Sequence, residues 1–213
     1  MNVAAILLAA GCSSRFEGGD KLLAELEGKP LILRAAQALA GSAACELVVV
    51  TRTTDAARRA ALASIPARHV VNDAPGQATS LAAGIAAIDR SATAAVVLPA
   101  DMPLVTSRDI DRLIAEFTRS MGRCIIYCRT GSGRRPPVLW PSSFFPELSR
   151  LTGDTGGKGL LAEYPDLRRA VTIADTCSHR FEDVDTMEDL VGIRQRLAAS
   201  PSKRSATHTP QPD

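Results

Sequence analysis

One loop near the start of the sequence carries residue types that bind polyphosphate. The segment LLAAGCSSRFEGGDK leaves an apolar run and supplies small, hydroxyl and basic side chains, among them Gly11, Ser13, Arg15 and Lys21. Glycine permits close backbone approach, serine donates hydrogen bonds, and fixed positive charges suit a group that packs several negative charges together. The loop is therefore predicted to hold the phosphates of a nucleoside triphosphate. A solvated surface loop is the plain alternative.

The two best-known glycine motifs for nucleotides do not account for this loop. It lacks the GxGxxG fingerprint of dinucleotide sites, which disfavours a dinucleotide-dependent oxidoreductase. The P-loop pattern GxxxxGK[ST] fails at TGDTGGKG, where Thr152 replaces the first glycine and Gly159 replaces the hydroxyl residue.

Two acidic segments indicate a metal site. In VVLPADMPLV, Asp101 directly follows an apolar strand, at the edge of the sheet where the first loop also lies. In FEDVDTMEDL, Asp183 and Asp185 alternate, so on an extended strand they share one face. Because Mg²⁺ prefers carboxylate and phosphate oxygens, these three aspartates are its predicted ligands. The alternatives are a turn role for Asp101 and a capping role for Asp185 or Thr186, with Asp189 as capping-box partner.

A third segment, APGQATSL, indicates a strand-to-helix turn that bears polar groups. Its amides and side chains suit the recognition of a base edge or ribose, and the candidates are Gly76, Gln77 and Ser80. An ordinary helix start explains the same pattern. The three histidines are isolated in the sequence and indicate no catalytic base.

The elements that must position these residues alternate between strands and helices. Strand-like apolar runs cover residues 3–9, 45–51, 68–71 and 93–99, and helix-like runs cover 30–41, 54–65 and 77–89. Strands that are apolar at nearly every position are typical of a sheet buried on both faces, and their alternation with helices indicates βαβ units. The expected fold class is α/β, a doubly wound, mostly parallel, Rossmann-like sheet in three α/β/α layers.

The second half is less regular. A helix is expected over residues 109–119, then strands at RCIIYCR and PPVLW around the turn TGSGRR. Short helices at PSSFFPEL and GGKGLLAEY, last strands at AVTIAD and HRFEDVD, and a closing helix at MEDLVGIRQRLAA follow. We expect one domain over residues 1–199 and a disordered tail over residues 200–213, because the tail is polar and aperiodic.

Composition narrows the class of protein. The chain has 213 residues, 46% of them hydrophobic, and a formal net charge of +2, too small to indicate nucleic acid as a partner. No apolar run reaches the roughly 18 residues needed to span a bilayer, so no membrane partner is expected. Five scattered cysteines suggest neither a zinc site nor disulfides, and the expected location is the cytoplasm.

These segments together resemble the MobA-like nucleotidyltransferases. The opening segment resembles the signature LAAGxSxRxGxxK, LPADMPLV resembles the metal-binding GDMP segment, and DVDTMEDL resembles the closing D-[IV]-[DN]-T-P-E-D segment. GQATSL and LTGDTGGKGLL resemble the branch of molybdenum cofactor cytidylyltransferases. The resemblance covers most of residues 3–195 in five ordered blocks, and it implies the nucleotidyltransferase version of the Rossmann-like fold.

The resemblance implies roles for residues. The triphosphate loop would comprise Leu8, Ala9, Ala10, Gly11, Arg15 and Lys21. Catalysis would depend on Arg15 and Lys21, which stabilise the departing pyrophosphate, and on Asp101, which holds Mg²⁺. The second carboxylate would be Asp183 or, as we favour, Asp185. The residues near the base would be Gly76, Gln77 and Ser80.

The implied reaction transfers CMP from CTP to the phosphate of the molybdopterin cofactor and releases pyrophosphate, with a molybdoenzyme as a further expected partner. Alternatives are a guanylyltransferase or another nucleotidyltransferase of the family, and a non-catalytic chaperone that binds nucleotide or cofactor. The segment RRPPVLW departs from the branch, because Arg135 and Pro136 precede Pro137 where relatives have Gly-His. The identity of the acceptor is therefore left open.

Overall fold

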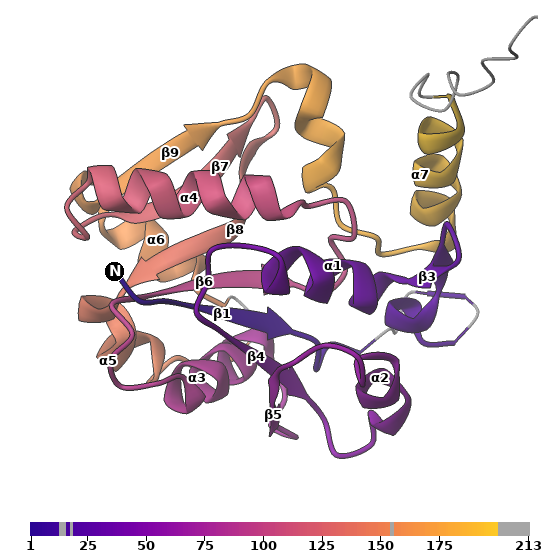
Figure 1. The fold of residues 1–213 in the computed structure, drawn as a ribbon, viewed down its shortest axis with the longest axis horizontal. Coiled ribbons are helices and arrows are strands. Elements are labelled where there is room, and N and C mark those ends of the chain that lie inside the picture. Colours follow the sequence, from indigo (N-terminus) through magenta and orange to yellow (C-terminus); the bar gives the residue numbers. More distant parts are fainter. Residues whose placement is uncertain (13–15, 18, 154–155, 200–213) are drawn as a thin grey trace, which may run out of the picture.

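The computed structural model describes residues 1–12, 16–17, 19–153 and 156–199. Within these residues, seven strands form one sheet in the order β5-β4-β1-β6-β8-β7-β9 (Figure 1). The strands are β1 (Val3–Leu8), β4 (Glu46–Thr51), β5 (Arg68–Val71), β6 (Ala94–Pro99), β7 (Ile125–Thr130), β8 (Gly133–Pro141) and β9 (Arg168–Thr172). The expected strand at AVTIAD corresponds to β9. The expected tail of residues 200–213 lies outside the described residues.

The sheet has a topological switch point between β1 and β6. The chain moves from β1 outward through β4 to β5, and then returns to place β6 on the other side of β1. β8 runs antiparallel to its neighbours β6 and β7, and the other described pairs of this seven-stranded sheet are parallel. In such sheets ligands bind in the crevice beyond the carboxyl ends of the strands at the switch point. The expected doubly wound, mostly parallel α/β fold is confirmed.

Helices cover both faces of the sheet. Figure 1 shows α1 (Leu31–Ala40) and α4 (Ser107–Arg119) over one face, with α3 (Gln77–Ala87) and α5 (Phe145–Leu148) over the other. Side chains of β1 alternate between the two cores: Leu7 packs with α1 and α4, whereas Ile6 packs with α3. This alternation on a doubly covered strand explains why the apolar run has no polar gap. The remaining helices are α2 (Ala56–Ala61), α6 (Lys158–Glu163) and α7 (Met187–Ala199).

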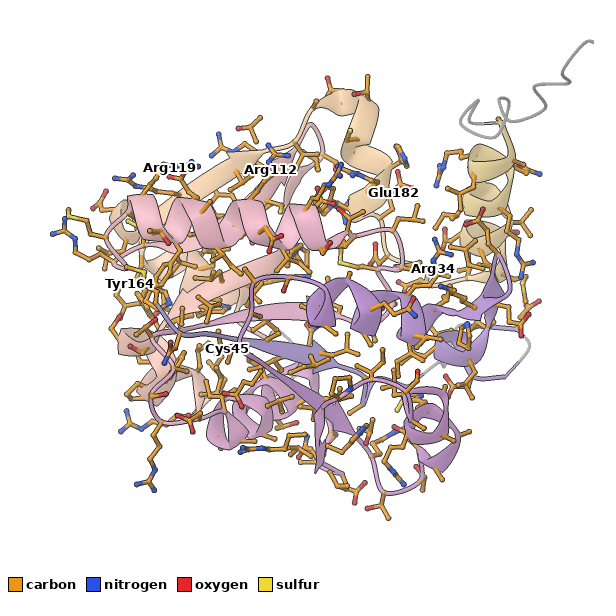
Figure 2. All side chains as sticks on the ribbon, viewed as in Figure 1. Arg34, Cys45, Arg112, Arg119, Tyr164 and Glu182 are labelled. Atoms are coloured by element: carbon orange, nitrogen blue, oxygen red, sulfur yellow. The ribbon has the colours of Figure 1, made fainter. Side chains whose placement is uncertain are left out.

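A third, smaller core attaches the end of the chain to its beginning. The short hairpin of β2 (Glu25–Leu26) and β3 (Lys29–Pro30) buries Leu26 together with Leu190 and Ile193 of α7. Hydrogen bonds flank this contact. Arg34 of α1 donates to the Leu26 carbonyl at 3.1 Å, and Arg194 of α7 donates to the Glu25 carbonyl at 2.6 Å (Figure 2 labels Arg34). Strands of two residues are too short for an alternating apolar pattern, so the hairpin was not among the expected elements.

The expected strand at HRFEDVD is wrong. A 3₁₀ helix, η4 (Asp175–Phe181), takes its first half, and the rest is irregular. Phe181 and Val184 are both buried, three positions apart. On a strand, Phe181 would share its face with Asp183 and Asp185, so its burial would have buried two carboxylates as well.

The expected helix over residues 54–65 is also shorter than predicted. α2 ends at Ala61, and the following amides bond three residues back, including Ala63 to Ala60 and Ile65 to Leu62. Pro66 prevents a further turn, because proline cannot donate to the helix and restricts the residue before it.

Helix α3 packs closely on the sheet at Gly84. A Cβ atom at Gly84 would lie 2.7 Å from Cγ2 of Ile6 and 3.3 Å from Cγ2 of Val50. We expect Gly84→Ala to lower the free energy of unfolding by about 1–3 kcal/mol in denaturant titrations, because the helix must move off the sheet. Gly192→Ala in α7 is the control, since no atom lies within 4 Å of its added Cβ. It should be neutral or stabilising by up to about 1 kcal/mol. Equal destabilisation by both variants would contradict the prediction.

Candidate active site

The Lys21 ammonium lies between two carboxylates at the crevice. Its Nζ atom donates to Oδ2 of Asp101 at 2.8 Å and to Oδ1 of Asp185 at 2.9 Å. Lys21 is only 9% exposed, and it opens the short 3₁₀ helix η1 (Lys21–Leu23). The formal charges of these three side chains sum to one negative charge, because one ammonium faces two carboxylates.

The backbone brings these three residues together from distant parts of the chain. Ala100 donates to the Leu8 carbonyl at 3.0 Å, which continues the β1–β6 ladder to the residue before Asp101. Val184 then donates to the Asp101 carbonyl at 2.9 Å, so the segment that holds Asp185 lies against the Asp101 turn. The buried Val184 side chain anchors this segment in the small core under α7.

Burial and charge act in opposite directions on this triad. Burial disfavours the charged form of Lys21, but Asp101 and Asp185 outweigh it and raise the pKa of Lys21 above its ordinary value. Burial also raises the pKa of the Asp101 carboxyl, and Lys21 offsets this only in part because Asp183 and Asp185 add negative charge nearby. A cation beside Asp101 therefore favours the charged form of its carboxyl against the effect of burial.

A capping box at the start of α7 orients Asp185. Oδ2 of Asp189 accepts from the backbone N–H groups of Asp185 and Thr186, at 3.0 and 2.8 Å. The N–H of Asp189 donates to Oγ1 of Thr186 at 3.2 Å. The predicted pairing of Thr186 with Asp189 is confirmed, and it leaves the Asp185 side chain to bind Lys21.

A cavity of about 200 Å³ adjoins the triad. Its polar lining includes Gln77, Asp101, Arg134, Arg135, Lys158 and Asp183. The antiparallel pairing of Val138 in β8 with Val97 in β6 carries the start of β8 to the carboxyl end of β6. The arginines that begin β8 therefore reach the same crevice as Asp101.

The three predicted metal ligands occupy different surroundings. Asp185 shares the Lys21 ammonium with Asp101, and its side chain is 28% exposed. The Asp183 side chain is 52% exposed, and its Oδ1 lies 3.7 Å from Nη1 of Arg135. Among the described residues, no three His, Cys, Asp or Glu side chains gather as a metal-binding cluster. Asp101 and Asp185 are hard oxygen donors that already hold one cation between them, and this donor chemistry fits Mg²⁺ when phosphate oxygens complete its shell.

The predicted phosphate loop is described only in part. Leu8 ends β1 and lines the cavity, and Ala9 donates to the Val50 carbonyl at 2.9 Å, so the loop starts from the sheet. Ala10 and Gly11 follow, and Ser13 and Arg15 lie outside the described residues.

The predicted base-recognition residues divide between two surroundings. Gly76 has a φ of 99° and caps α3, and Gln77 next to it lines the cavity. A Cβ atom at Gly156 would lie 2.9 Å from Oε1 of Gln77, so the glycine-rich loop passes directly over this side chain. Ser80 instead is buried and hydrogen bonds with Asn72 at 3.3 Å, inside the turn.

The sequence pattern did not indicate Arg134 and Arg135 as cavity residues, and Arg135 stood out only as a departure from a family pattern. Both line the cavity together with Trp140, which is 2% exposed. The available signal was the pair of consecutive arginines before an apolar run. Their approach to Asp101 depends on the antiparallel placement of β8, which the sequence pattern did not indicate.

Comparison with known proteins identifies close similarities. The profile of the family described as "MobA-like NTP transferase domain" matches residues 5–169. A "Probable molybdenum cofactor guanylyltransferase" from Thermococcus gammatolerans is 33% identical over 194 residues, 86% of this chain and 95% of that one. A "Molybdenum cofactor guanylyltransferase" from Rhodopseudomonas palustris is 32% identical over 151 residues, 68% of this chain and 70% of that one.

A solved structure shares the fold. The crystal structure of Rv0371c from Mycobacterium tuberculosis H37Rv superposes with a TM-score of 0.78 at 26% identity, covering 91% of this chain and 98% of that one. Within the described residues of this chain, no helix is both long and apolar enough to cross a membrane.

The stability of the start of α7 depends on pH through the carboxyl group of Asp189. Burial raises its pKa, but the hydrogen bonds from Thr186 and the Asp185 amide outweigh this and hold the pKa of Asp189 below its ordinary 3.8. A carboxyl with a lowered folded pKa stabilises the fold above its unfolded pKa, and the stabilisation is lost as pH falls through the folded value. We expect Asp189→Ala to lower the free energy of unfolding by about 1 kcal/mol at pH 7. The difference in free energy of unfolding between the variant and the wild type should shrink when the pH falls below the ordinary aspartate pKa. Urea titrations at pH 7 and at such an acidic pH measure this difference.

The control for this variant is Glu188→Ala, which removes a neighbouring carboxylate from the same helical turn. It alters the helix dipole without touching the capping box, so its effect at pH 7 should be smaller. An equal loss in both variants would show that the negative charge matters and that the capping box does not.

Proposed function

The chain belongs to the MobA-like NTP transferase family and is a nucleotidyltransferase, and from this premise we propose that it transfers a nucleoside monophosphate to the phosphate of a molybdopterin-type cofactor. The acceptor phosphate oxygen forms a bond to the α-phosphorus of a nucleoside triphosphate. The bond from the α-phosphorus to the bridging oxygen breaks, and pyrophosphate leaves. The observation that carries this proposal is the Lys21 ammonium held by Asp101 and Asp185 beside a cavity lined by arginines.

The reaction requires the protein to position the reacting groups and to neutralise their charge. Displacement at an α-phosphorus proceeds in line and needs neutralisation of the charge that develops on the leaving group. Lys21 belongs to the part of the nucleotide loop that the structure describes, and we propose that it neutralises the charge of the departing pyrophosphate. Arg15 remains a predicted second cation for the same group. An acceptor phosphate is ionised at neutral pH, so the reaction needs no general base. The isolated histidines agree with that requirement.

Asp101 and Asp185 would hold the divalent metal. Mg²⁺ bound there would neutralise phosphate charge and orient the reacting oxygens. The chain's own part is to keep both carboxylates in place through the Asp101 turn and the α7 capping box. Without such a cation, burial would push Asp101 toward its neutral form.

The cavity supports an anionic acceptor. Arg134, Arg135 and Lys158 line it together with apolar side chains that include Trp140 and Phe181. Guanidinium groups bind phosphate in a fixed fork, and apolar walls suit an organic ring system. The relatives named as molybdenum cofactor guanylyltransferases support a pterin-type acceptor.

The names of these relatives favour GTP as the nucleotide donor. The preference for CTP, expected from the sequence motifs, has no support from them, so we propose GTP first and keep CTP as the alternative. Delivery of the finished cofactor to a molybdoenzyme stays a prediction.

Pyrophosphate release tests the proposed reaction. The purified protein is mixed with molybdopterin and Mg²⁺ or Mn²⁺, and GTP, CTP, ATP and UTP are offered separately. We expect release with GTP, and release with CTP alone would move the protein to the cytidylyl branch.

Asp101→Asn should abolish release while nucleotide affinity stays within a few-fold. No release by the wild type with any donor, together with nucleotide binding, would contradict the proposal and favour a chaperone. NAD(P) binding instead would favour an oxidoreductase.

The two aspartates near the end of the chain make a matched pair. We expect Asp185→Asn to lower kcat by about 10²-fold, the usual effect of losing one charge contact at the reacting phosphate. Asp183→Asn changes a more exposed carboxylate that faces Arg135, and its kcat should fall less than about tenfold. Steady-state kinetics with both variants measures this difference. A larger loss in Asp183→Asn would move the second metal ligand to Asp183.

A further inference from the structure

The most buried charged side chain of the described residues is not part of the triad. Arg58 of α2 is 1% exposed. Its Nε and Nη2 atoms bind the two carboxylate oxygens of Asp20 at 2.6 and 2.9 Å, and its Nη1 contacts Oδ2 of Asp55 at 3.3 Å. Burying a guanidinium costs free energy unless hydrogen-bond partners satisfy it. The segments that supply these partners are therefore the ones that Arg58 holds in place.

The partners of Arg58 include both ends of the nucleotide loop. Nη1 donates to the Ala9 carbonyl at 2.5 Å and to the Gly11 carbonyl at 3.0 Å, where the chain leaves β1. Asp20 lies at the other end of the same loop, directly before Lys21. One guanidinium from a helix outside the loop therefore joins residues 9 and 11 to residue 20.

The contact extends through Asp20 to the triad. Oδ1 of Asp20 accepts the backbone N–H of Leu22 at 3.0 Å and so caps η1, the helical turn that Lys21 begins. The hydrogen-bonded path runs from Arg58 to Asp20, from Asp20 to the backbone of η1, and from the Lys21 side chain to Asp101 and Asp185.

The same contact orients peptide groups at the start of the loop. In a trans peptide the carbonyl and the following N–H point in opposite directions. With the Ala9 and Gly11 carbonyls aimed at Arg58, the N–H groups of Ala10 and Cys12 point away from the guanidinium. Donors held in a fixed direction favour an anion, because the backbone need not reorganise when the anion binds.

We propose that Arg58 is a positioning residue for the nucleotide loop: it closes the loop at its two ends and so presents the loop amides and the Lys21 ammonium in the geometry that binds a triphosphate. The assignment of the ligand rests on the proposed function. The closure of the loop rests only on the contacts of Arg58.

Substitutions of the two consecutive arginines of α2, Arg58 and Arg59, test this proposal. Arg58→Met removes the guanidinium and keeps an unbranched apolar side chain in its place. Arg59→Met is the matched control, because the Arg59 side chain donates to the backbone carbonyls of Arg52 and Thr53 and to the hydroxyl of Thr51 at the end of β4, and to none of the residues that Arg58 contacts. Arg58→Lys restores the charge without the fork that spans Asp20 and the two carbonyls.

The first measurement is hydrogen exchange of backbone amides in the nucleotide-free, full-length protein. We expect exchange in residues 9–23 to be about tenfold faster or more in Arg58→Met, with Arg58→Lys between it and the wild type, because an unclosed loop samples more conformations. Exchange in β6 and α4 should match the wild type in both variants, and exchange in residues 9–23 should match the wild type in Arg59→Met. Unchanged exchange in residues 9–23 would overturn the proposal, whether or not nucleotide binds.

The second measurement is nucleotide affinity and steady-state kinetics with GTP and CTP in Mg²⁺. We expect the Kd and KM of the nucleotide to rise about tenfold or more in Arg58→Met, since the ordering of the loop must then be supplied on binding. The affinity should be partly restored in Arg58→Lys. A purely structural arginine would lower the melting temperature and the yield of folded enzyme but leave the KM of the folded fraction unchanged, and that result would overturn the proposal.

Asp20→Ala, which removes both oxygens that Arg58 and Leu22 contact, covers the case in which Arg58→Met does not fold. Its side chain is 27% exposed, so its replacement leaves the buried guanidinium with its contacts to Ala9, Gly11 and Asp55. Exchange should then rise mainly around residues 20–23, and an unchanged rate there would also contradict the proposal. If the wild type binds no triphosphate while Arg58→Met still speeds exchange in the loop, the proposed function fails and the closure by Arg58 stands.

Discussion

The site depends on the attraction between one ammonium and two carboxylates that come from three distant segments. Lys21 is 80 residues from Asp101 and 164 residues from Asp185, yet its Nζ atom lies within 2.9 Å of an oxygen of each. Burial raises the pKa of Asp101 and the Lys21 ammonium opposes this rise, so the lysine favours the charged form of that carboxyl. The β1–β6 ladder, the Asp101 turn and the capping box of α7 all serve to bring these charges together.

Much of the fold could be predicted from local patterns. Apolar runs alternating with helices indicated the parallel half of the sheet, because each of β1, β4 and β6 is buried on both faces and so has a continuous apolar run. Asp101 and Lys21 were found for the same reason: both follow strands whose carboxyl ends meet at one edge of the sheet. The metal assignment of Asp101 and Asp185 and the nucleotide role of the loop remain proposals.

The errors occurred where long-range contacts decide the structure. The alternation in HRFEDVD indicated a strand, but the burial of Phe181 and Val184 gives the segment an irregular path along the Asp101 turn. Arg58 lies in a stretch that reads as an ordinary amphipathic helix, and its burial depends on Asp20, 38 residues away. The approach of Arg134 and Arg135 to Asp101 depends on β8 running antiparallel to β6. These three contacts join distant residues, so no local period could reveal them.

The small core that joins α7 to the β2–β3 hairpin has a consequence for the order in which the protein matures. This core holds Leu26 of the β2–β3 hairpin against α7, and Asp185 lies just before that helix. During synthesis the sheet strands β1, β4 and β6 are complete long before the ribosome releases Leu190 and Ile193. The nascent chain therefore contains Lys21 and Asp101 early, and Asp185 joins them only after the sheet strands have been made. A chain that stops before Asp185 lacks the second carboxylate of the triad, and one that stops before α7 lacks the capping box that holds Asp185 in place.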